Sequence, residues 1–267
     1  MKRMIINKKI TVILALLFIG FAACNKDNEA EHAIQVLVNG YNGSANALVV
    51  AIDTTVYDQK AGNGTFIIKP ESKFEFNAVY TYFPNQQNRM VVITDTATKK
   101  TIFSKPLYTN GTKANFNFLF IDGKEVEVPA QAVDTATNKL SFYIRYTASD
   151  APIDIFLYKK DNTTGKEDRA YLAKGVKPNT WIYTNYIADT TFGNKNVLGS
   201  AARIYFTKAG TTDQWAFEDN ENKSKMNAFG MALPLTKEKG LVQPYFLTPG
   251  KLEVEKARLF FHPDRPW

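Results

Sequence analysis

Apolar and polar residues alternate in short stretches along most of the chain. Phe74, Phe76, Ala78 and Tyr80 alternate with polar neighbours in one stretch, and Phe116, Phe118 and Phe120 do so in another. A period of two places one set of side chains on one face of a half-buried strand. No stretch after the N-terminal segment keeps a helical period, so the pattern predicts an all-β protein.

The expected strands fall into two groups separated by a break in the alternation. The first group covers residues 34–38, 47–52, 65–68, 73–82, 90–94, 101–103, 115–120 and 125–128, and the second covers residues 140–146, 153–158, 181–187, 203–207 and 214–217. Asp122-Gly123 joins the last two strands of the first group and predicts a tight hairpin turn, because both central residues of a type I′ turn need positive φ.

The break at residues 129–138 contains Pro, Ala, Thr and Asn and no hydrophobe larger than valine. Such a composition is typical of a linker. Each group begins with the same order of elements: a strand, a small polar turn and an apolar strand. The two beginnings are about a hundred residues apart, which is an ordinary domain length. We therefore expect two tandem antiparallel, Ig-like β-sandwich domains over residues 33–128 and 139–267. The alternative, that any two β-sandwich sequences show such a vague likeness, stays open.

The N-terminal segment has a different character. Residues 1–9 contain four cations and no acid, and residues 10–23 are almost entirely apolar. This is the pattern of a signal peptide, and Phe21-Ala22-Ala23-Cys24 resembles a bacterial lipobox, in which the cysteine is lipidated and becomes the first residue after cleavage. We expect a signal peptide over 1–23, lipidation at Cys24 and a tether over 24–32. A plain secretory signal or an uncleaved anchor are the alternatives.

Removal of this segment changes the charge balance. The full chain has 33 cations and 26 acids, and the mature chain would keep 29 cations against the same 26 acids. So small an excess gives no reason to expect a nucleic-acid partner. The single cysteine, if lipidated, leaves no thiol for a disulfide or for catalysis. The expected location is the outer membrane, on the cell surface or on the periplasmic face, with the lipid as the membrane partner.

The stretch Ala148-Ser149-Asp150-Ala151-Pro152-Ile153-Asp154-Ile155 resembles the A-S-P-D-A-P-x-V-D-V motif of a widespread family of uncharacterised bacterial lipoprotein domains, often found in tandem. The stretch lacks the first proline of the motif and one residue before the aspartate. The resemblance covers about residues 140–187 and, more weakly, 34–82. It implies an extracellular Ig-like sandwich and no activity.

Residues for catalysis are scarce. The chain has only two histidines, His32 and His262, which do not form a pair at metal-ligand spacing. Nucleophile-elbow, dinucleotide and phosphate-loop motifs are absent from the sequence. The acidic loop at residues 161–165 lacks the alternating acids and the distal glutamate of a calcium loop. The one at residues 218–221 could hold a Ca²⁺ ion, but Lys223 and Lys225 follow it at once, so a solvated hairpin tip is expected. The expectation is therefore a protein that is not an enzyme and needs no cofactor and no metal.

Binding residues are easier to nominate. Tyr82, Phe83 and Arg89 flank a loop rich in Asn and Gln, and Trp181 and Tyr186 belong to the corresponding region of the second half. A sugar ring needs a flat aromatic surface beside amide or guanidinium groups, so these five residues are the expected ligand-binding set and a glycan is the first guess. Alternate aromatics can also belong to the core, which is the expectation for Trp181 and Tyr183. The rival role is an interaction module, such as an assembly subunit or a partner of an outer-membrane transporter.

Overall fold

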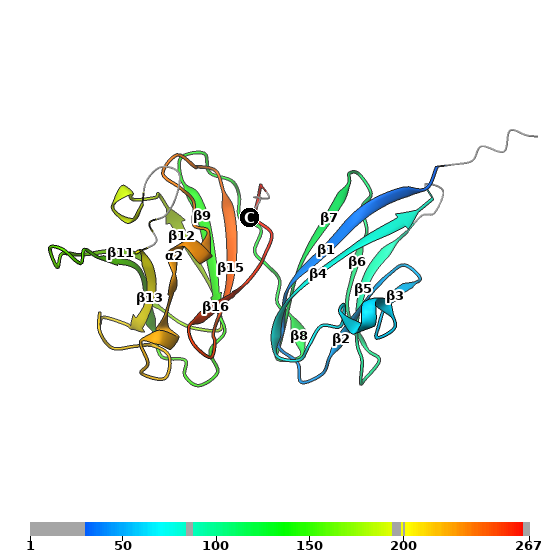
Figure 1. Cartoon of the computed structure of the whole chain (residues 1–267), viewed down its shortest axis with the longest axis horizontal. Helices are drawn as coiled ribbons and strands as arrows, with labels where there is room; N and C mark the ends of the chain where they lie inside the picture. Colours follow the sequence, from blue (N-terminus) through cyan, green and yellow to red (C-terminus); the bar gives the residue numbers. More distant parts are fainter. Residues whose placement is uncertain (1–29, 84–87, 194–198, 200, 264–267) are drawn as a thin grey trace, which may run out of the picture.

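A computed structural model describes residues 30–83, 88–193, 199 and 201–263 of the chain. Cys24 and most of the expected tether lie outside the described residues, as do residues 84–87 of the predicted binding loop. The described chain is nearly all β, as predicted, and forms two sandwiches that stand side by side (Figure 1).

The first sandwich pairs two four-stranded sheets, with strand orders β4-β1-β7-β8 and β3-β2-β5-β6. Its strands are β1 (His32–Asn42), β2 (Leu48–Ile52), β3 (Thr55–Tyr57), β4 (Ser72–Tyr82), β5 (Met90–Asp95), β6 (Thr101–Pro106), β7 (Lys113–Ile121) and β8 (Lys124–Glu125), with the short helix η1 (Ala61–Gly64) after β3.

The second sandwich pairs the sheets β12-β9-β15-β16 and β11-β10-β13-β14. Its strands are β9 (Asn138–Ile144), β10 (Ile153–Lys160), β11 (Glu167–Val176), β12 (Trp181–Tyr186), β13 (Arg203–Lys208), β14 (Lys225–Asn227), β15 (Val242–Pro249) and β16 (Val254–Ala257). Its helices are η2 (Thr190–Phe192), η3 (Asn222–Ser224) and the four-residue α2 (Ala228–Met231).

The two sandwiches have the same topology. Adding eight to each strand number of the first converts both of its sheet orders into those of the second. Even the one parallel pair of each sandwich corresponds, β1 with β7 and β9 with β15. The tandem sandwiches are therefore confirmed. The sheets are antiparallel apart from this one pair in each sandwich, in which the first strand joins the last long strand in parallel.

The alternating stretches build the cores. Phe76, Ala78 and Tyr80 of β4 and Phe118 and Phe120 of β7 are buried in one cluster of the first sandwich. Asp122 and Gly123 adopt φ of 50° and 79°, which confirms the hairpin turn.

Several strand predictions differ from the structure. The strand expected at residues 65–68 is a turn with a single bridge between Leu48 and Ile68, and the observed strands β3, β14, β15 and β16 were not predicted. The strand expected at 125–128 shortens to the two-residue β8, and the one expected at 214–217 is a turn with a single bridge between Thr207 and Trp215. The ten-residue β11 was not predicted, because its polar residues and Gly175 give no clean alternation.

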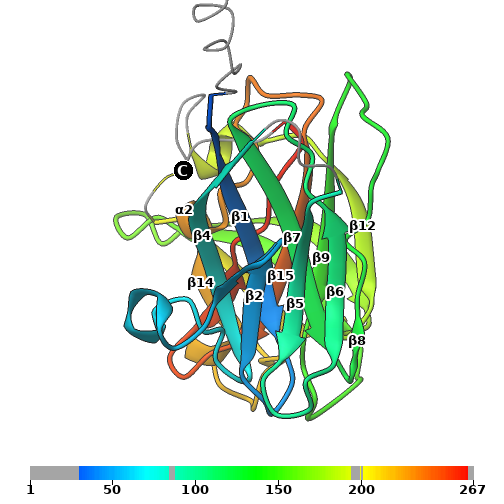
Figure 2. The ribbon, with the colours of Figure 1, turned by 90° about the vertical axis from the view of Figure 1, so that its right-hand side faces the viewer.

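The inner sheets of the two sandwiches pack against each other. Leu119 and Ile121 of β7 share a buried cluster with Tyr143 of β9 and Phe246 of β15. Around this apolar centre, Lys73 pairs with Glu255 at 2.9 Å and Arg145 pairs with Asp122 at 2.8 Å. The molecule is thus a stack of four sheets, and Figure 2 looks onto it from the first sandwich, with β2, β5 and β6 toward the viewer.

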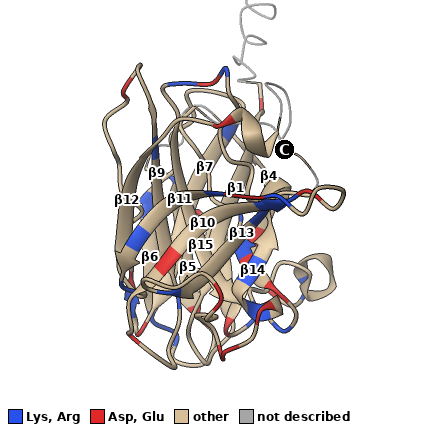
Figure 3. Ribbon diagram, turned by 90° about the vertical axis from the view of Figure 1, so that its left-hand side faces the viewer, with Lys and Arg blue, Asp and Glu red and all other residues tan. Residues whose placement is uncertain are grey.

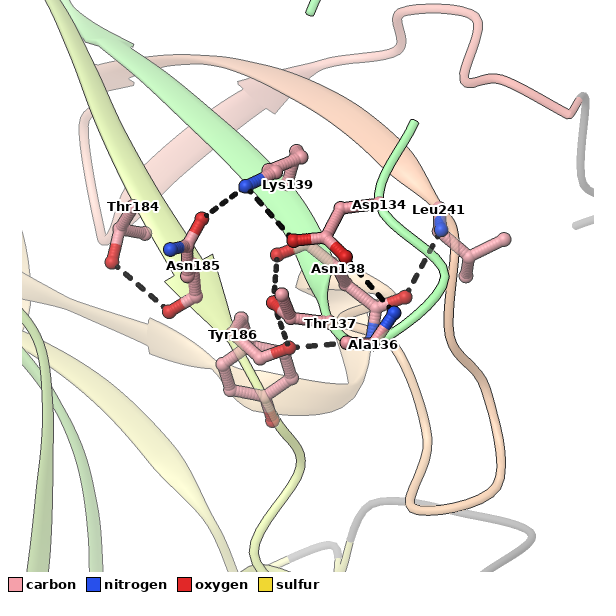
Figure 4. A network of polar contacts seen from close by, with 9 residues as sticks. All are labelled: Asp134, Ala136, Thr137, Asn138, Lys139, Thr184, Asn185, Tyr186 and Leu241. Atoms are coloured by element: carbon pink, nitrogen blue, oxygen red, sulfur yellow. Dashed lines mark hydrogen bonds and ion pairs between the residues drawn. The ribbon is translucent and has the colours of Figure 1, made fainter. Parts of the chain in front are cut away.

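The connection between the sandwiches ends in a buried hydrogen-bond network (Figure 4). The Asn138 side chain donates to the carbonyl of Tyr186 at 3.3 Å and accepts from the Leu241 amide at 3.1 Å. It also donates to the carbonyl of Glu238 at 2.8 Å. Lys139 contacts the carboxylate of Asp134 at 3.3 Å. The three Asn138 bonds fix the entry of the chain into β9 because each satisfies a backbone group that would otherwise be orphaned.

None of the helices within the described residues has the length and apolar character needed to cross a membrane.

Candidate functional site

The outer sheet of the second sandwich carries aromatic residues on its outward surface. In β10, Ile153, Ile155 and Leu157 point into the core, so the alternate residues Phe156 and Tyr158 point outward. The cross-strand partners of Phe156 are aromatic as well: Phe156 lies opposite Tyr205 of β13 and Tyr171 of β11. We call the set Phe156, Tyr158, Tyr171, Tyr205 and Trp215 the outer aromatic face.

The rings of the outer aromatic face form a continuous row. Ring centroids lie 5.4 Å apart between Tyr171 and Phe156, 5.9 Å between Phe156 and Tyr205, and 5.3 Å between Tyr205 and Trp215. The Tyr158 ring meets Tyr205 edge-on at 5.0 Å. Rings at these separations attract one another beyond their shared burial, so the row is held in place before any ligand arrives.

Exposure is graded along the row. Phe156 and Tyr205 at its centre are 1% and 9% exposed, whereas Tyr171 at one end is 39% exposed. Tyr158 and Trp215 are partly exposed. The central rings therefore support the outer ones, and Tyr171, Tyr158 and Trp215 are the rings that a ligand can reach. Figure 3 views the molecule from this side, with β10, β11 and β13 toward the viewer.

Polar groups line the edge of the outer aromatic face. The Tyr205 hydroxyl donates to Glu221 at 3.1 Å, and Lys225 contacts the same carboxylate at 2.9 Å. The hydrogen bond from Lys225 lowers the pKa of Glu221, and burial together with that carboxylate raises the pKa of Tyr205 to about 12. At neutral pH the edge thus presents a neutral phenol and an ionised carboxylate.

Two cations cover part of the rings. The Arg169 guanidinium lies 5.4 Å from the centre of the Tyr158 ring, and the Lys174 ammonium lies 3.8 Å from that of Tyr171. These are cation–π contacts, which are worth little at an exposed site. The Lys174 ammonium is a donor beside the exposed Tyr171 ring, and the Arg169 guanidinium also donates to Glu167 at 2.7 Å.

Asp154 holds the neighbouring loops in position. Its buried carboxylate accepts hydrogen bonds from the amides of Gly175 and Gly210 at 2.7 and 3.0 Å. Thr207 donates to the carbonyl of Thr211 at 2.9 Å within the same turn. This turn leads into Trp215, so Asp154 is a positioning residue for the Trp215 end of the row.

The chemistry of the outer aromatic face is suited to binding. Burial raises the pKa of the Tyr158 and Tyr205 hydroxyls, the neighbouring Glu221 carboxylate is paired with Lys225, and the face contains no histidine or cysteine. Across the described part of the chain, no cluster of three or more His, Cys, Asp or Glu could hold a metal ion. Flat rings bordered by donors and acceptors can take a planar or ring-shaped ligand with an apolar face and polar edges.

The residues predicted at the first loop occupy a different environment from the one expected. Tyr82 and Arg89 are 6% and 7% exposed, and the Arg89 guanidinium lies 4.2 Å over the Tyr82 ring. Arg89 also donates to the carbonyl of Phe83, and the Phe83 side chain is 45% exposed. The expectation that Tyr82 is exposed is therefore wrong. Tyr82 lies on the same side of β4 as Ala78 and Tyr80, and that side faces the core of the first sandwich.

The predicted residues of the second half are also separated from one another. Tyr186 is 7% exposed, and burial raises its pKa to about 12. Trp181 packs between the sandwiches, where its indole donates to the carbonyl of Glu127 at 2.9 Å. The expectation of a core position is wrong for Tyr183, which is 56% exposed because it lies on the outward side of β12.

Sequence reasoning missed the outer aromatic face. Phe156 and Tyr158 lie in a predicted strand, and Tyr205 lies in another, but their partner strand β11 was not predicted. One signal was present: Phe156 and Tyr158 alternate with apolar residues, so apolar and aromatic side chains occupy both surfaces of one strand. Each strand of a sandwich has one surface in the core and one toward solvent. When both surfaces of such a strand are apolar, an apolar patch on the solvent side is indicated.

No protein-family model matches the sequence, and no curated protein matches it. Among solved structures, a family 26 carbohydrate-binding module from Eubacterium rectale in complex with maltoheptaose is 10% identical, with 87% of this chain and 98% of that chain covered and a TM-score of 0.23. A Bacteroides ovatus protein that is assigned to cell adhesion by inference is 12% identical, with 86% of this chain and 97% of that chain covered and a TM-score of 0.23. The shaft pilin of Lactobacillus rhamnosus is 11% identical, with 83% and 100% covered and a TM-score of 0.17. Likenesses this distant carry no argument about function.

Proposed function

We propose that this chain is a non-catalytic glycan-binding protein and that the outer aromatic face is its binding surface. The observation that carries the proposal is the row of rings on the solvent side of β10, β11 and β13, outside the core of the second sandwich. A monomeric protein rarely leaves such a set of rings at its surface without a ligand or partner.

The ligand class follows from the composition of the surface. The apolar face of a sugar ring stacks on an aromatic side chain, and its hydroxyl groups hydrogen-bond to the polar groups around that side chain. Tyr171 supplies an exposed ring at one end of the row and Trp215 a partly exposed ring at the other, and Glu221 and Arg169 supply an acceptor and a donor beside it. A flat surface of this kind fits an extended glycan better than a compact small molecule, which needs an enclosing pocket.

A glycan array on soluble protein that begins at Asn25 tests the proposal. Trp215→Ala and Tyr171→Ala should each weaken binding several-fold, because a stacked ring contributes on the order of 1 kcal/mol. Tyr183→Ala is the matched control, since it removes an exposed tyrosine on another sheet.

Undiminished binding by both face variants would contradict the proposed surface. If the parent protein binds no glycan, the rival function is favoured, in which the same rings form an interface with another protein, such as an assembly subunit or an outer-membrane transporter. Circular dichroism of each variant separates loss of a contact from loss of the fold.

We further propose that Cys24 is lipidated and anchors the protein in the outer membrane. The support is the cationic, apolar and small-residue order that ends at the only cysteine of the chain. Cys24→Ala should abolish incorporation of labelled palmitate and release the protein from the membrane fraction, because two or more acyl chains are needed for stable anchoring. Equal labelling of variant and parent would contradict the anchor.

A further inference from the structure

A cleft of about 700 Å³ lies between the two sandwiches. The first sandwich lines it with β6 and the residues that follow, with the first half of β7 and with the connecting segment around Pro129. The second sandwich lines it with the start of β15 and with residues 260–262. Ligand sites favour such interfaces, and this volume is in their usual range.

The cleft exists because β8 is short. The β7–β8 ladder covers only Phe120 and Ile121 of β7, with one more bond from the Val126 amide to the Leu119 carbonyl. Beyond Leu119, no strand in the described part of the chain pairs with β7 on this side. Asn115 and Asn117 alternate with Leu119, so their side chains share its surface and border the opening.

The C-terminal segment forms a fixed wall of the cleft. The Asn117 side chain accepts from the Phe260 amide at 2.8 Å and donates to the Phe260 carbonyl at 3.3 Å. The backbones of His262 and Val242 exchange two hydrogen bonds, of 2.8 and 2.9 Å. Asn117 is therefore occupied in joining the sandwiches, and Asn115 beside it is exposed.

The remaining lining groups offer stacking and hydrogen bonding together. Tyr108 is 69% exposed at the cleft, and Phe116 packs edge-on against Phe103 with centroids 6.1 Å apart behind it. The side-chain nitrogen of Gln131 is buried and has no acceptor among the described residues. A buried donor without an acceptor is costly, and a ligand hydroxyl placed in the cleft would satisfy it.

We infer that this cleft is a second saccharide-binding site, independent of the outer aromatic face, in which Tyr108 stacks on a sugar ring and Asn115 and Gln131 bind its hydroxyl groups. The inference extends the proposed function, because it requires that the protein bind glycans. The cleft is lined by β15 of the inner sheet, whereas the outer aromatic face lies on β10, β11 and β13 of the outer sheet of the same sandwich. One molecule would then engage two glycan segments at once and gain avidity on a polymer.

Isothermal titration with maltoheptaose, cellohexaose, xylohexaose and chitohexaose tests the inference on protein that begins at Asn25. The expected result is two sites for at least one of these probes. Tyr108→Ala should weaken one site several-fold and leave the other unchanged, and Gln131→Met, which keeps the side-chain length but removes the donor, should weaken the same site. Trp215→Ala should affect only the other site, and Tyr183→Ala should affect neither.

The outcomes separate the two proposals. A single site that is lost in Trp215→Ala and unaffected by Tyr108→Ala and Gln131→Met overturns the cleft and keeps the outer aromatic face. A single site with the opposite response keeps the cleft and overturns the outer aromatic face. No heat of binding with any probe, together with an empty glycan array, overturns both.

Discussion

The outer sheets of the two sandwiches share a topology and differ in what they present to solvent. The inward triplets Leu48, Val50 and Ile52 of β2 and Ile153, Ile155 and Leu157 of β10 can be matched one to one. With that match, the outward pair Ala51–Val92 of the first sandwich holds the place of Phe156–Tyr205 in the second. One copy has a small aliphatic surface, and the other has the outer aromatic face.

This difference separates the requirements of folding from those of binding. Both inward surfaces must be apolar, because the two sheets of a sandwich bury them against each other. The outward surface is not constrained by the fold, so it can carry a function in one copy and none in the other. The proposed glycan surface thus depends on residues that the sandwich does not need.

The largest expected effect concerns the centre of the outer aromatic face. Phe156 is 1% exposed although it lies outside the core, so Phe156→Ala should lower the free energy of unfolding by about 3–5 kcal/mol, as ring truncation in a core does. The matched change Val92→Ala in the first sandwich removes a partly exposed aliphatic group and should cost less than about 1.5 kcal/mol.

Urea denaturation followed by circular dichroism measures both free energies. Equal losses for the two variants would show that the rings around Phe156 are loosely packed, and the proposed support of Tyr171 and Trp215 by the central rings would then be wrong.

A smaller effect is expected for Asp154, whose matched position in the first sandwich is Val49. Asp154→Ala leaves the amides of Gly175 and Gly210 without their acceptor and should cost about 2 kcal/mol of stability. Because these bonds hold the turn before Trp215, the variant should also bind glycan more weakly. Asp154→Asn keeps one acceptor oxygen and should recover part of both losses. Unchanged glycan binding in a folded Asp154→Ala protein would remove its positioning role.

The sequence predicts the fold well because alternation records burial. The β4 and β7 strands and the Asp122-Gly123 turn each follow from residues whose environment is set by near neighbours. The repeat was visible for the same reason: corresponding strands in the two halves meet the same burial requirement.

The binding site could not be predicted to the same degree. Alternation shows that Tyr80 and Tyr82 lie on the same surface of β4, but it does not show which surface of the strand faces the core. In the structure both tyrosines are buried in the core. The outer aromatic face brings together three strands and a turn, and one of those strands, β11, has no clear pattern. The cleft depends on how the two sandwiches pack, which is decided by contacts between residues more than a hundred positions apart, such as Asn117 and Phe260.

The smallest expected effect is a dependence of stability on pH at Tyr205 of the second outer sheet. The first outer sheet has Val92 at the matched position, which cannot titrate. Burial and the Glu221 carboxylate raise the pKa of Tyr205 to about 12, above the value of about 10 expected for an unfolded tyrosine. The folded protein therefore holds this proton more tightly, and the stability it contributes is complete below pH of about 10 and is lost as the pH rises toward 12.

Tyr205→Phe should cost about 1 kcal/mol near pH 7, because it removes the hydrogen bond to Glu221. The difference between parent and variant should then shrink as the pH rises above about 10, since only the parent can ionise at this position. Val92→Ala provides the control, because neither side chain titrates and its cost should stay constant with pH. Denaturation curves measured from neutral to alkaline pH give the free energies of unfolding of the parent and of Tyr205→Phe. A difference that stays constant with pH would mean that the Tyr205 hydroxyl is solvated. The outer aromatic face would then be more open than its burial indicates.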